Sequence, residues 1–144
     1  MNDKNPAHVL LVEDNDGDIF LIQEAFAESK FDVDLSMVRN GQEAIDFVFK
    51  NKEYQEAKRP DLILLDINIP IFNGHEVLAK IKSDPQMRKI PVIMLTTSSN
   101  QRDIDKSYGN NCNAYINKPS EMEGLFQVVL KIEEFWLKLV KLAN

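Results

Sequence analysis

The stretch Leu62-Ile63-Leu64-Leu65-Asp66 joins four consecutive apolar residues to a single acid. Two further runs have the same form: Val9-Leu10-Leu11-Val12 precedes Glu13-Asp14, and Val92-Ile93-Met94-Leu95 precedes Thr96. Continuous apolar runs of this length are typical of strands that are buried on both faces of a parallel sheet. The three runs therefore predict the central strands of an α/β domain, and each of these strands ends at a polar residue.

Two weaker signals predict edge strands. Val33, Leu35 and Met37 alternate with polar residues, while Ala114-Tyr115-Ile116 is short and lies between asparagines. Five amphipathic stretches separate or follow the strands. Their apolar positions are Ile19, Ile22, Ala25 and Phe26 after the capping candidates Asn15 and Asp16; Ala44, Ile45, Val48 and Phe49 after Asn40; Val77, Leu78 and Ile81 before Pro85; Ile104 and Tyr108; and a long stretch from Met122 to Leu142.

Strands that alternate with helices predict right-handed crossovers and a doubly wound, five-stranded parallel sheet. With the second and fifth strands at the edges, the expected strand order is 2-1-3-4-5, an established order for doubly wound folds. Ligands of such sheets bind beyond the carboxyl ends of the strands, at the switch point between strands 1 and 3. We therefore expect the functional site at that edge.

Length and composition limit the class of protein. The 144 residues predict one domain over residues 1–144, and 44% hydrophobic with 28% charged residues is ordinary globular usage. The net charge of -6 disfavours nucleic acid as a direct partner. No apolar run reaches the length of about 18–20 residues that a membrane span needs. With the single cysteine Cys112 and no secretion signal, we expect a cytoplasmic protein.

Acids converge at the predicted switch point. Glu13 and Asp14 follow strand 1, and Asp66 follows strand 3. If the two strands are neighbours, mutual repulsion raises the pKa of the carboxylates unless they share a cation, and Mg²⁺ is the hard, oxygen-preferring ion that fits. Thr96 at the end of strand 4 and Lys118 after strand 5 are expected at the same edge.

This combination fits phosphoryl transfer, whose transition state spreads negative charge over oxygens that require neutralisation. A carboxylate can itself be the nucleophile and form an aspartyl phosphate. Each residue alone has an ordinary structural explanation: an acid at a strand end is usually a solvated charge or a helix cap, Thr96 could cap the next helix, and Lys118 could be a surface charge. Their joint placement on four strand ends favours function.

Several motifs in this order resemble the receiver-domain family of response regulators. The motifs are Val9-Leu10-Leu11-Val12-Glu13-Asp14-Asn15, Asp66-Ile67-Asn68-Ile69-Pro70 with Gly74, Leu95-Thr96, and Tyr115-Ile116-Asn117-Lys118-Pro119. The resemblance spans nearly the whole chain. It implies a flavodoxin-like receiver fold and a phosphorelay in which a sensor histidine kinase phosphorylates Asp66. A protein of this kind is a phosphoacceptor in signalling and not a turnover enzyme.

The resemblance also implies roles for individual residues. Glu13, Asp14, Asp66 and the backbone carbonyl of Asn68 would bind the metal, Thr96 and Lys118 would contact the phosphoryl oxygens, Thr96 and Tyr115 would form the switch, and a cis bond would precede Pro119. Ile69 and Thr97 differ from the residues common in the family, Met and Ala respectively. Either difference could alter access to the phosphoryl group.

A narrower resemblance concerns the kinase. Leu95-Thr96-Thr97-Ser98, the extended loop after the second helix and Phe135-Trp136-Leu137 resemble small single-domain response regulators that serve phytochrome-type kinases.

The last helix, expected over about 122–142, indicates a second partner. Its core-facing stripe comprises Leu125, Val128, Val129, Ile132, Trp136 and Leu139, and Phe126, Leu130, Phe135, Leu137 and Leu142 lie off it. This excess of apolar surface favours a homodimer through helix 4, strand 5 and helix 5, although the same side chains could instead cover the sheet edge.

Two other functions share part of this pattern. A Mg²⁺-dependent phosphatase of the haloacid-dehalogenase type uses similar chemistry, but it carries its nucleophile and second acid two residues apart after strand 1. A degenerate receiver that binds partners without phosphorylation is disfavoured because all five polar site residues are present. His75 and His8 are expected to have no part in the chemistry, with His75 at the surface or in a helix cap.

Overall fold

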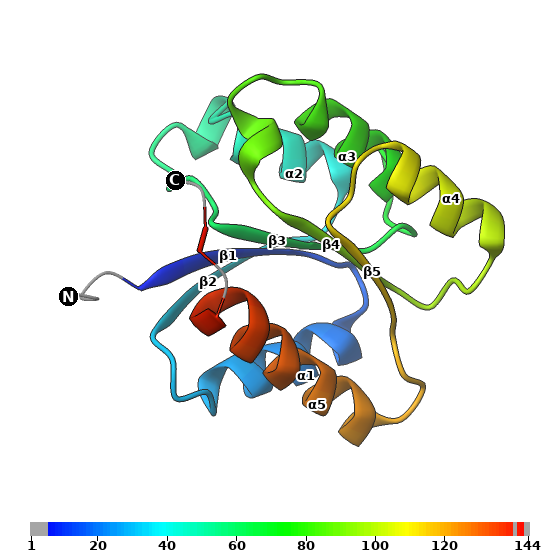
Figure 1. The fold of residues 1–144 in the computed structure, drawn as a ribbon. Coiled ribbons are helices and arrows are strands. Elements are labelled where there is room, and N and C mark those ends of the chain that lie inside the picture. Colours follow the sequence, from blue (N-terminus) through cyan, green and yellow to red (C-terminus); the bar gives the residue numbers. More distant parts are fainter. Residues whose placement is uncertain (1–5, 140, 143–144) are drawn as a thin grey trace.

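The computed structural model describes residues 6–139 and 141–142, and it contains a five-stranded parallel sheet in the order β2-β1-β3-β4-β5 (Figure 1). The strands are β1 (Ala7–Val12), β2 (Val33–Val38), β3 (Leu62–Leu65), β4 (Val92–Thr96) and β5 (Ala114–Asn117). The predicted fold class, strand order and edge positions are confirmed.

The helices cover both faces of the sheet, with α1 and α5 on one side and α2, α3 and α4 on the other (Figure 1). They are α1 (Asp16–Ala27), α2 (Gly41–Val48), α3 (Gly74–Lys82), α4 (Gln101–Gly109) and α5 (Met122–Ile132), with short 3₁₀ turns η1 (Lys52–Tyr54) and η2 (Met87–Lys89). Within the described residues, none of these helices combines the length and the apolar character that a membrane span requires.

The apolar strand runs form two core layers because successive side chains of a strand point to opposite faces. Leu10 packs into the layer beneath α2 and α3, whereas Val9 and Leu11 pack into the layer beneath α1 and α5. The residues of β1 from Val9 onward and all of β3 and β4 are buried. The central strands are therefore fixed by apolar burial on both faces. The polar residues that follow them lie at the carboxyl ends of the strands.

Asparagine side chains begin the first four helices. Asn15, Asn40, Asn73 and Asn100 each accept a hydrogen bond from a backbone N–H in the first turn of the helix that follows, and Asn73 forms a reciprocal capping box with Glu76. These caps set the residue at which the chain turns from the sheet edge into each helix. They therefore also fix the loops that carry the functional side chains.

The C-terminal helix differs from its prediction. The α-helix ends at Ile132, a π-helical segment (η3, Glu133–Leu139) continues the path, and Lys141 and Leu142 lie outside helical structure. Residue 140 and the side chain of Leu139 lie outside the described part of the chain. A π-helix bonds residue i to i+5 rather than i+4, so a stripe extrapolated with the α-helical period loses its phase there. Phe135 is 50% exposed.

Candidate functional site

The two acids of the switch point follow paired residues of neighbouring strands. Val12, the last residue of β1, pairs with Leu65, the last residue of β3, so Glu13 and Asp66 leave the sheet side by side. Both are buried, with exposed fractions of 1% and 6%. Two buried carboxylates in contact are unfavourable unless positive charge lies between them.

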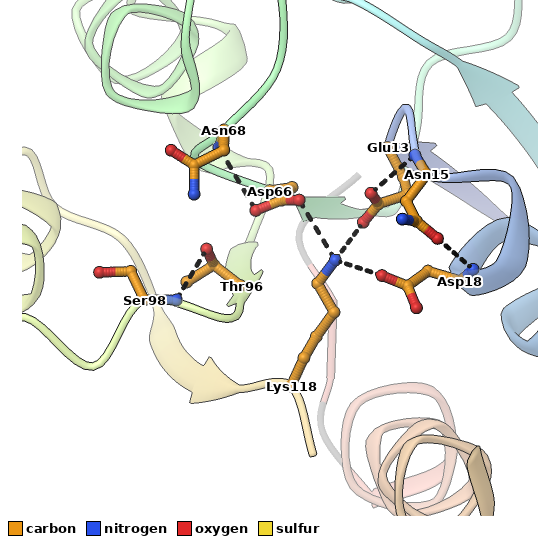
Figure 2. Close-up of polar contacts among 8 residues, drawn as sticks. All are labelled: Glu13, Asn15, Asp18, Asp66, Asn68, Thr96, Ser98 and Lys118. Atoms are coloured by element: carbon orange, nitrogen blue, oxygen red, sulfur yellow. Dashed lines mark hydrogen bonds and ion pairs between the residues drawn. The ribbon is translucent and has the colours of Figure 1, made fainter. Parts of the chain in front are cut away.

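Lys118 supplies that charge. Its Nζ lies 2.8 Å from Glu13 Oε1, 2.7 Å from Asp18 Oδ2 and 3.2 Å from Asp66 Oδ2 (Figure 2). A lysine ammonium has three N–H donors, and these three carboxylates can accept one each. One cation therefore serves three acids, and the cluster has a surplus of negative charge.

Burial and the neighbouring charges both shift the pKa values of Glu13 and Lys118. Burial raises the pKa of Glu13 to about 7, and the charge of Asp66 adds to the rise while the hydrogen bond from Lys118 opposes it. Burial alone would lower the pKa of the Lys118 ammonium, but Asp18, Glu13 and Asp66 together raise it above the ordinary lysine value. Lys118 is therefore a permanent cation, and a further positive charge near Glu13 would be favourable.

Thr96 ends β4 at the same edge (Figure 2) and is fully buried. Its carbonyl accepts from the backbone N–H of Lys118 at 2.7 Å, and its hydroxyl Oγ1 accepts from Ser98 N at 3.4 Å. Two residues on, the Ser98 carbonyl accepts from the Tyr115 hydroxyl at 2.8 Å. The loop after β4 thus connects the acidic cluster to Tyr115 on β5.

The model of the response regulator receiver domain matches residues 9–130. The chain belongs to the response regulator receiver family. Glu13, Asp66 and Lys118 directly follow strands β1, β3 and β5 of this receiver domain, and Thr96 is the last residue of β4.

Individual relatives resemble this receiver over nearly its whole length. It is 44% identical over 137 residues to the response regulator Rcp1 of Synechocystis sp., an alignment that covers 95% of this chain and 93% of Rcp1. The crystal structure of phosphorylated RcpA, a cyanobacterial phytochrome response regulator, matches with a TM-score of 0.95 at 48% identity, covering 97% of this chain and all of RcpA. The Mn²⁺-bound form of Rcp1 matches with a TM-score of 0.93 at 43% identity, covering 96% and 100%.

The residues of the receiver fit a hard metal ion by their chemistry, because the predicted side-chain ligands Glu13, Asp14 and Asp66 offer carboxylate oxygens only. Asp14 is exposed beside buried Glu13, and Asn68 lies two residues beyond Asp66, to whose Oδ1 its N–H donates at 3.4 Å. Among the described residues, no three acidic, histidine or cysteine side chains are already grouped as a metal-binding cluster. The ammonium of Lys118 lies among the buried carboxylates instead.

Three details of the receiver differ from expectation or went unforeseen. Asp18 contacts Lys118 although the sequence pattern did not single it out. His75 is buried, not at the surface, because it packs under α4, where its Nε2 lies 3.0 Å from Asp103 Oδ1. The peptide bond before Pro119 is trans, not cis, which is the ordinary preference of X–Pro bonds.

Proposed function

We propose that this receiver accepts a phosphoryl group from a sensor histidine kinase onto Asp66 in a Mg²⁺-dependent reaction. The observation that carries the proposal is the position of the Asp66 carboxylate, buried at the end of β3 and 3.2 Å from the Lys118 ammonium. Asp66 lies at the switch point of the sheet, where doubly wound folds bind their ligands. The chain would act as a phosphoacceptor in signalling.

In the reaction, one oxygen of Asp66 attacks the phosphorus of a phosphohistidine on the kinase. A P–O bond forms, the P–N bond breaks, and its electron pair stays on the imidazole nitrogen. Negative charge spreads over the three remaining phosphoryl oxygens in the transition state. Lys118 donates to one of these oxygens, and the Thr96 hydroxyl at the end of β4 donates to another.

A metal ion would complete the neutralisation. Glu13, Asp14, Asp66 and the backbone carbonyl of Asn68 would hold Mg²⁺, which supplies positive charge to the transferred oxygens when bound. The raised pKa of Glu13 is consistent with this assignment, because burial first and the charge of Asp66 second make the carboxylate costly to ionise without a further cation. The preference for Mg²⁺ over other hard ions is part of the proposal.

The signal leaves the site through Thr96 and Tyr115. A Thr96 hydroxyl that turns toward the phosphoryl group gives up the hydrogen bond from Ser98 N. Ser98 in turn holds the Tyr115 hydroxyl through its carbonyl. A shift of the loop after β4 therefore changes the position of Tyr115 and conveys phosphorylation to the α4, β5 and α5 face.

The direct test is incubation with Mg²⁺ and acetyl phosphate, followed by mass spectrometry of the intact chain. We expect one added phosphoryl group that is sensitive to hydroxylamine, and none in Asp66→Asn. Asp61→Asn, which changes an acid at the opposite end of β3, is the matched control and should retain the modification. Equal, hydroxylamine-sensitive modification of Asp66→Asn would refute the assignment of Asp66.

The two alternatives lose support. The phosphatase hypothesis requires a nucleophile and a second acid two residues apart after strand 1, whereas Asp66 follows β3. Steady turnover of small phosphomonoesters would revive it. The degenerate receiver requires a defective site, whereas Glu13, Asp66 and Lys118 make direct contacts here.

The kinase is proposed to be a phytochrome-type histidine kinase in the cytoplasm. Two observations support it: the likeness to Rcp1 and to RcpA, a phytochrome response regulator, over nearly the full chain, and the sequence Phe135-Trp136-Leu137 after α5. Phosphotransfer from a purified phytochrome-type kinase should be faster than from an unrelated histidine kinase. Equal rates from both would contradict this pairing.

We also propose that two copies of this chain form a homodimer through α4, β5 and α5. Phe135 on η3 and Tyr108 on α4 are each about half exposed, at 50% and 51%. A groove of about 280 Å³ lies between Ile116 on β5 and the α5–η3 segment, with mainly apolar lining. Phe126 and Leu137 pack partly against the core instead, as expected for side chains that cover the sheet edge.

Sedimentation at tens of micromolar, with and without beryllofluoride, tests the dimer. Phe135→Asp should dissociate it, and Phe20→Asp on α1, which changes a somewhat more exposed aromatic side chain outside the face, should not. A purely monomeric wild-type profile under both conditions would refute the dimer. Dimerisation that survives both Phe135→Asp and Leu137→Asp would place the interface elsewhere.

A further inference from the structure

Asp18 makes the shortest of the three contacts of Lys118, 2.7 Å from Oδ2 to Nζ, yet it has no role in the reaction proposed above. The other two partners of the ammonium do have roles, since Asp66 accepts the phosphoryl group and Glu13 holds the metal. Figure 2 shows Asp18 reaching the ammonium from the start of α1. It is therefore the one carboxylate on Lys118 that the reaction leaves in place.

The start of α1 is built to hold Asp18 in this orientation. The Asn15 side chain caps the helix by accepting from the backbone N–H of Asp18 itself, at 2.9 Å. The N-terminal turn of a helix also favours a negative charge through its dipole. The Asp18 side chain is 26% exposed, whereas that of Lys118 is 4% exposed, so Asp18 is the most solvent-accessible of the three partners of the ammonium.

Lysine needs such an anchor because its ammonium sits on a flexible four-carbon stem. During transfer, the charge on Asp66 moves onto phosphoryl oxygens, and a bound metal ion would compete with the ammonium for the carboxylate of Glu13. Both changes alter the two other bonds of the ammonium. A charge-assisted bond to a fixed carboxylate keeps Nζ within reach of the phosphoryl oxygens throughout.

We propose that Asp18 is a positioning residue that anchors the Lys118 ammonium beside Asp66 for phosphoryl transfer. This inference rests on the proposed function of Asp66 and adds a fourth acid, one that binds neither the phosphoryl group nor the metal. Its contribution acts only through Lys118.

A double-mutant cycle measures that dependence. The rate of Asp66 phosphorylation is followed with acetyl phosphate at saturating Mg²⁺ in wild type, Asp18→Ala, Lys118→Met and the double variant. We expect Asp18→Ala to lower the limiting rate by about tenfold with little change in the half-saturating acetyl phosphate concentration, as for the loss of one charge-assisted bond. Asp18→Asn, which keeps an acceptor oxygen, should lose roughly threefold. In the Lys118→Met background, Asp18→Ala should have no further effect.

Asp16→Ala is the matched control. It removes the same charge from the same helical turn, but Asp16 pairs with Arg39 at 2.7 Å and its side chain is 85% exposed. Its phosphorylation rate should equal that of wild type. Urea denaturation of each variant separates rate from stability, and Asp18→Asn keeps the test available if Asp18→Ala folds poorly.

Two results would overturn the inference while wild type is still phosphorylated on Asp66. One is a wild-type limiting rate in both Asp18 variants; the other is an equal loss from Asp18→Ala with and without Lys118. Wild type that gains no phosphoryl group would instead refute the proposed function, and the role of Asp18 in it.

Discussion

Gly74, the first residue of α3, lies against the backbone that carries Asp66, and its replacement by alanine should disturb the site. A Cβ at Gly74 would lie 2.3 Å from the carbonyl oxygen of Asp66 and 2.7 Å from the Cα of Ile67. Ordinary contacts begin near 3.4 Å, so the backbone must yield by about 1 Å. Overpacking usually costs about 1–3 kcal/mol, and we expect Gly74→Ala to lose about 2–3 kcal/mol because the obstructing atoms belong to the main chain. A displacement of this size also costs about 100-fold in rate where geometry controls a reaction.

Urea denaturation and acetyl phosphate kinetics measure the two effects. Gly109→Ala is the matched control, because no atom lies within 4 Å of a Cβ at that position and its φ is negative. It should leave phosphorylation unchanged and raise stability by about 0.4–1 kcal/mol, since alanine restricts the unfolded chain. A free energy of unfolding for Gly74→Ala within 0.5 kcal/mol of wild type, with a normal phosphorylation rate, would refute the argument.

Three further predictions concern metal, pH and strain. Saturating Mg²⁺ should raise the melting temperature above that in EDTA, and Asp14→Ala should abolish the difference; an unchanged metal response would place the metal elsewhere. Burial raises the pKa of Glu133 to about 7, with the Ser29 side chain offsetting part of the rise. Ionisation of Glu133 therefore destabilises the folded state as pH rises from about 4.5 to above 7. In urea denaturation, the free energy of unfolding of Glu133→Gln should exceed that of wild type by about 2 kcal/mol at pH 8 and should equal it at pH 4. Ile71, 68% exposed with a φ of 74°, is a β-branched residue in the left-handed region, so Ile71→Gly should stabilise the protein by about 1 kcal/mol in the same assay.

The sheet was predictable because its signals are local. Continuous apolar runs such as Leu62–Leu65 are typical of central strands, which are buried on both faces. Asparagine before an amphipathic stretch is a typical helix cap, and Asn15 and Asn40 cap α1 and α2. The C-terminal helix was less predictable. The apolar period continues past Ile132, but the change to π-helical bonding at buried Glu133 depends on what the helix packs against, so periodicity alone placed the end too late.

Strand-end residues of the candidate site were predictable for a related reason. Parallel strands deliver whatever follows them to one edge, so Glu13, Asp66, Thr96 and Lys118 could be placed together without coordinates. Asp18 could not, because it lies within a helix and meets a lysine 100 residues away only through the angle at which α1 leaves the sheet.

The burial of His75 was also not predictable from the strand ends, because it depends on a contact between α3 and α4. Its Nε2 faces Asp103, and the Ser98 hydroxyl donates to the other oxygen of that carboxylate at 2.6 Å. The hydrogen bond from Ser98 lowers the pKa of Asp103 most, and the one with His75 lowers it further, so both favour the ionised carboxylate. Asp103 in the first turn of α4 thus contacts both the buried histidine of α3 and Ser98, whose carbonyl accepts a hydrogen bond from the Tyr115 hydroxyl. Any movement of the loop after β4 must therefore shift α4 or break a charge-assisted bond, which ties the proposed switch to a helix that the strand-end pattern does not reach.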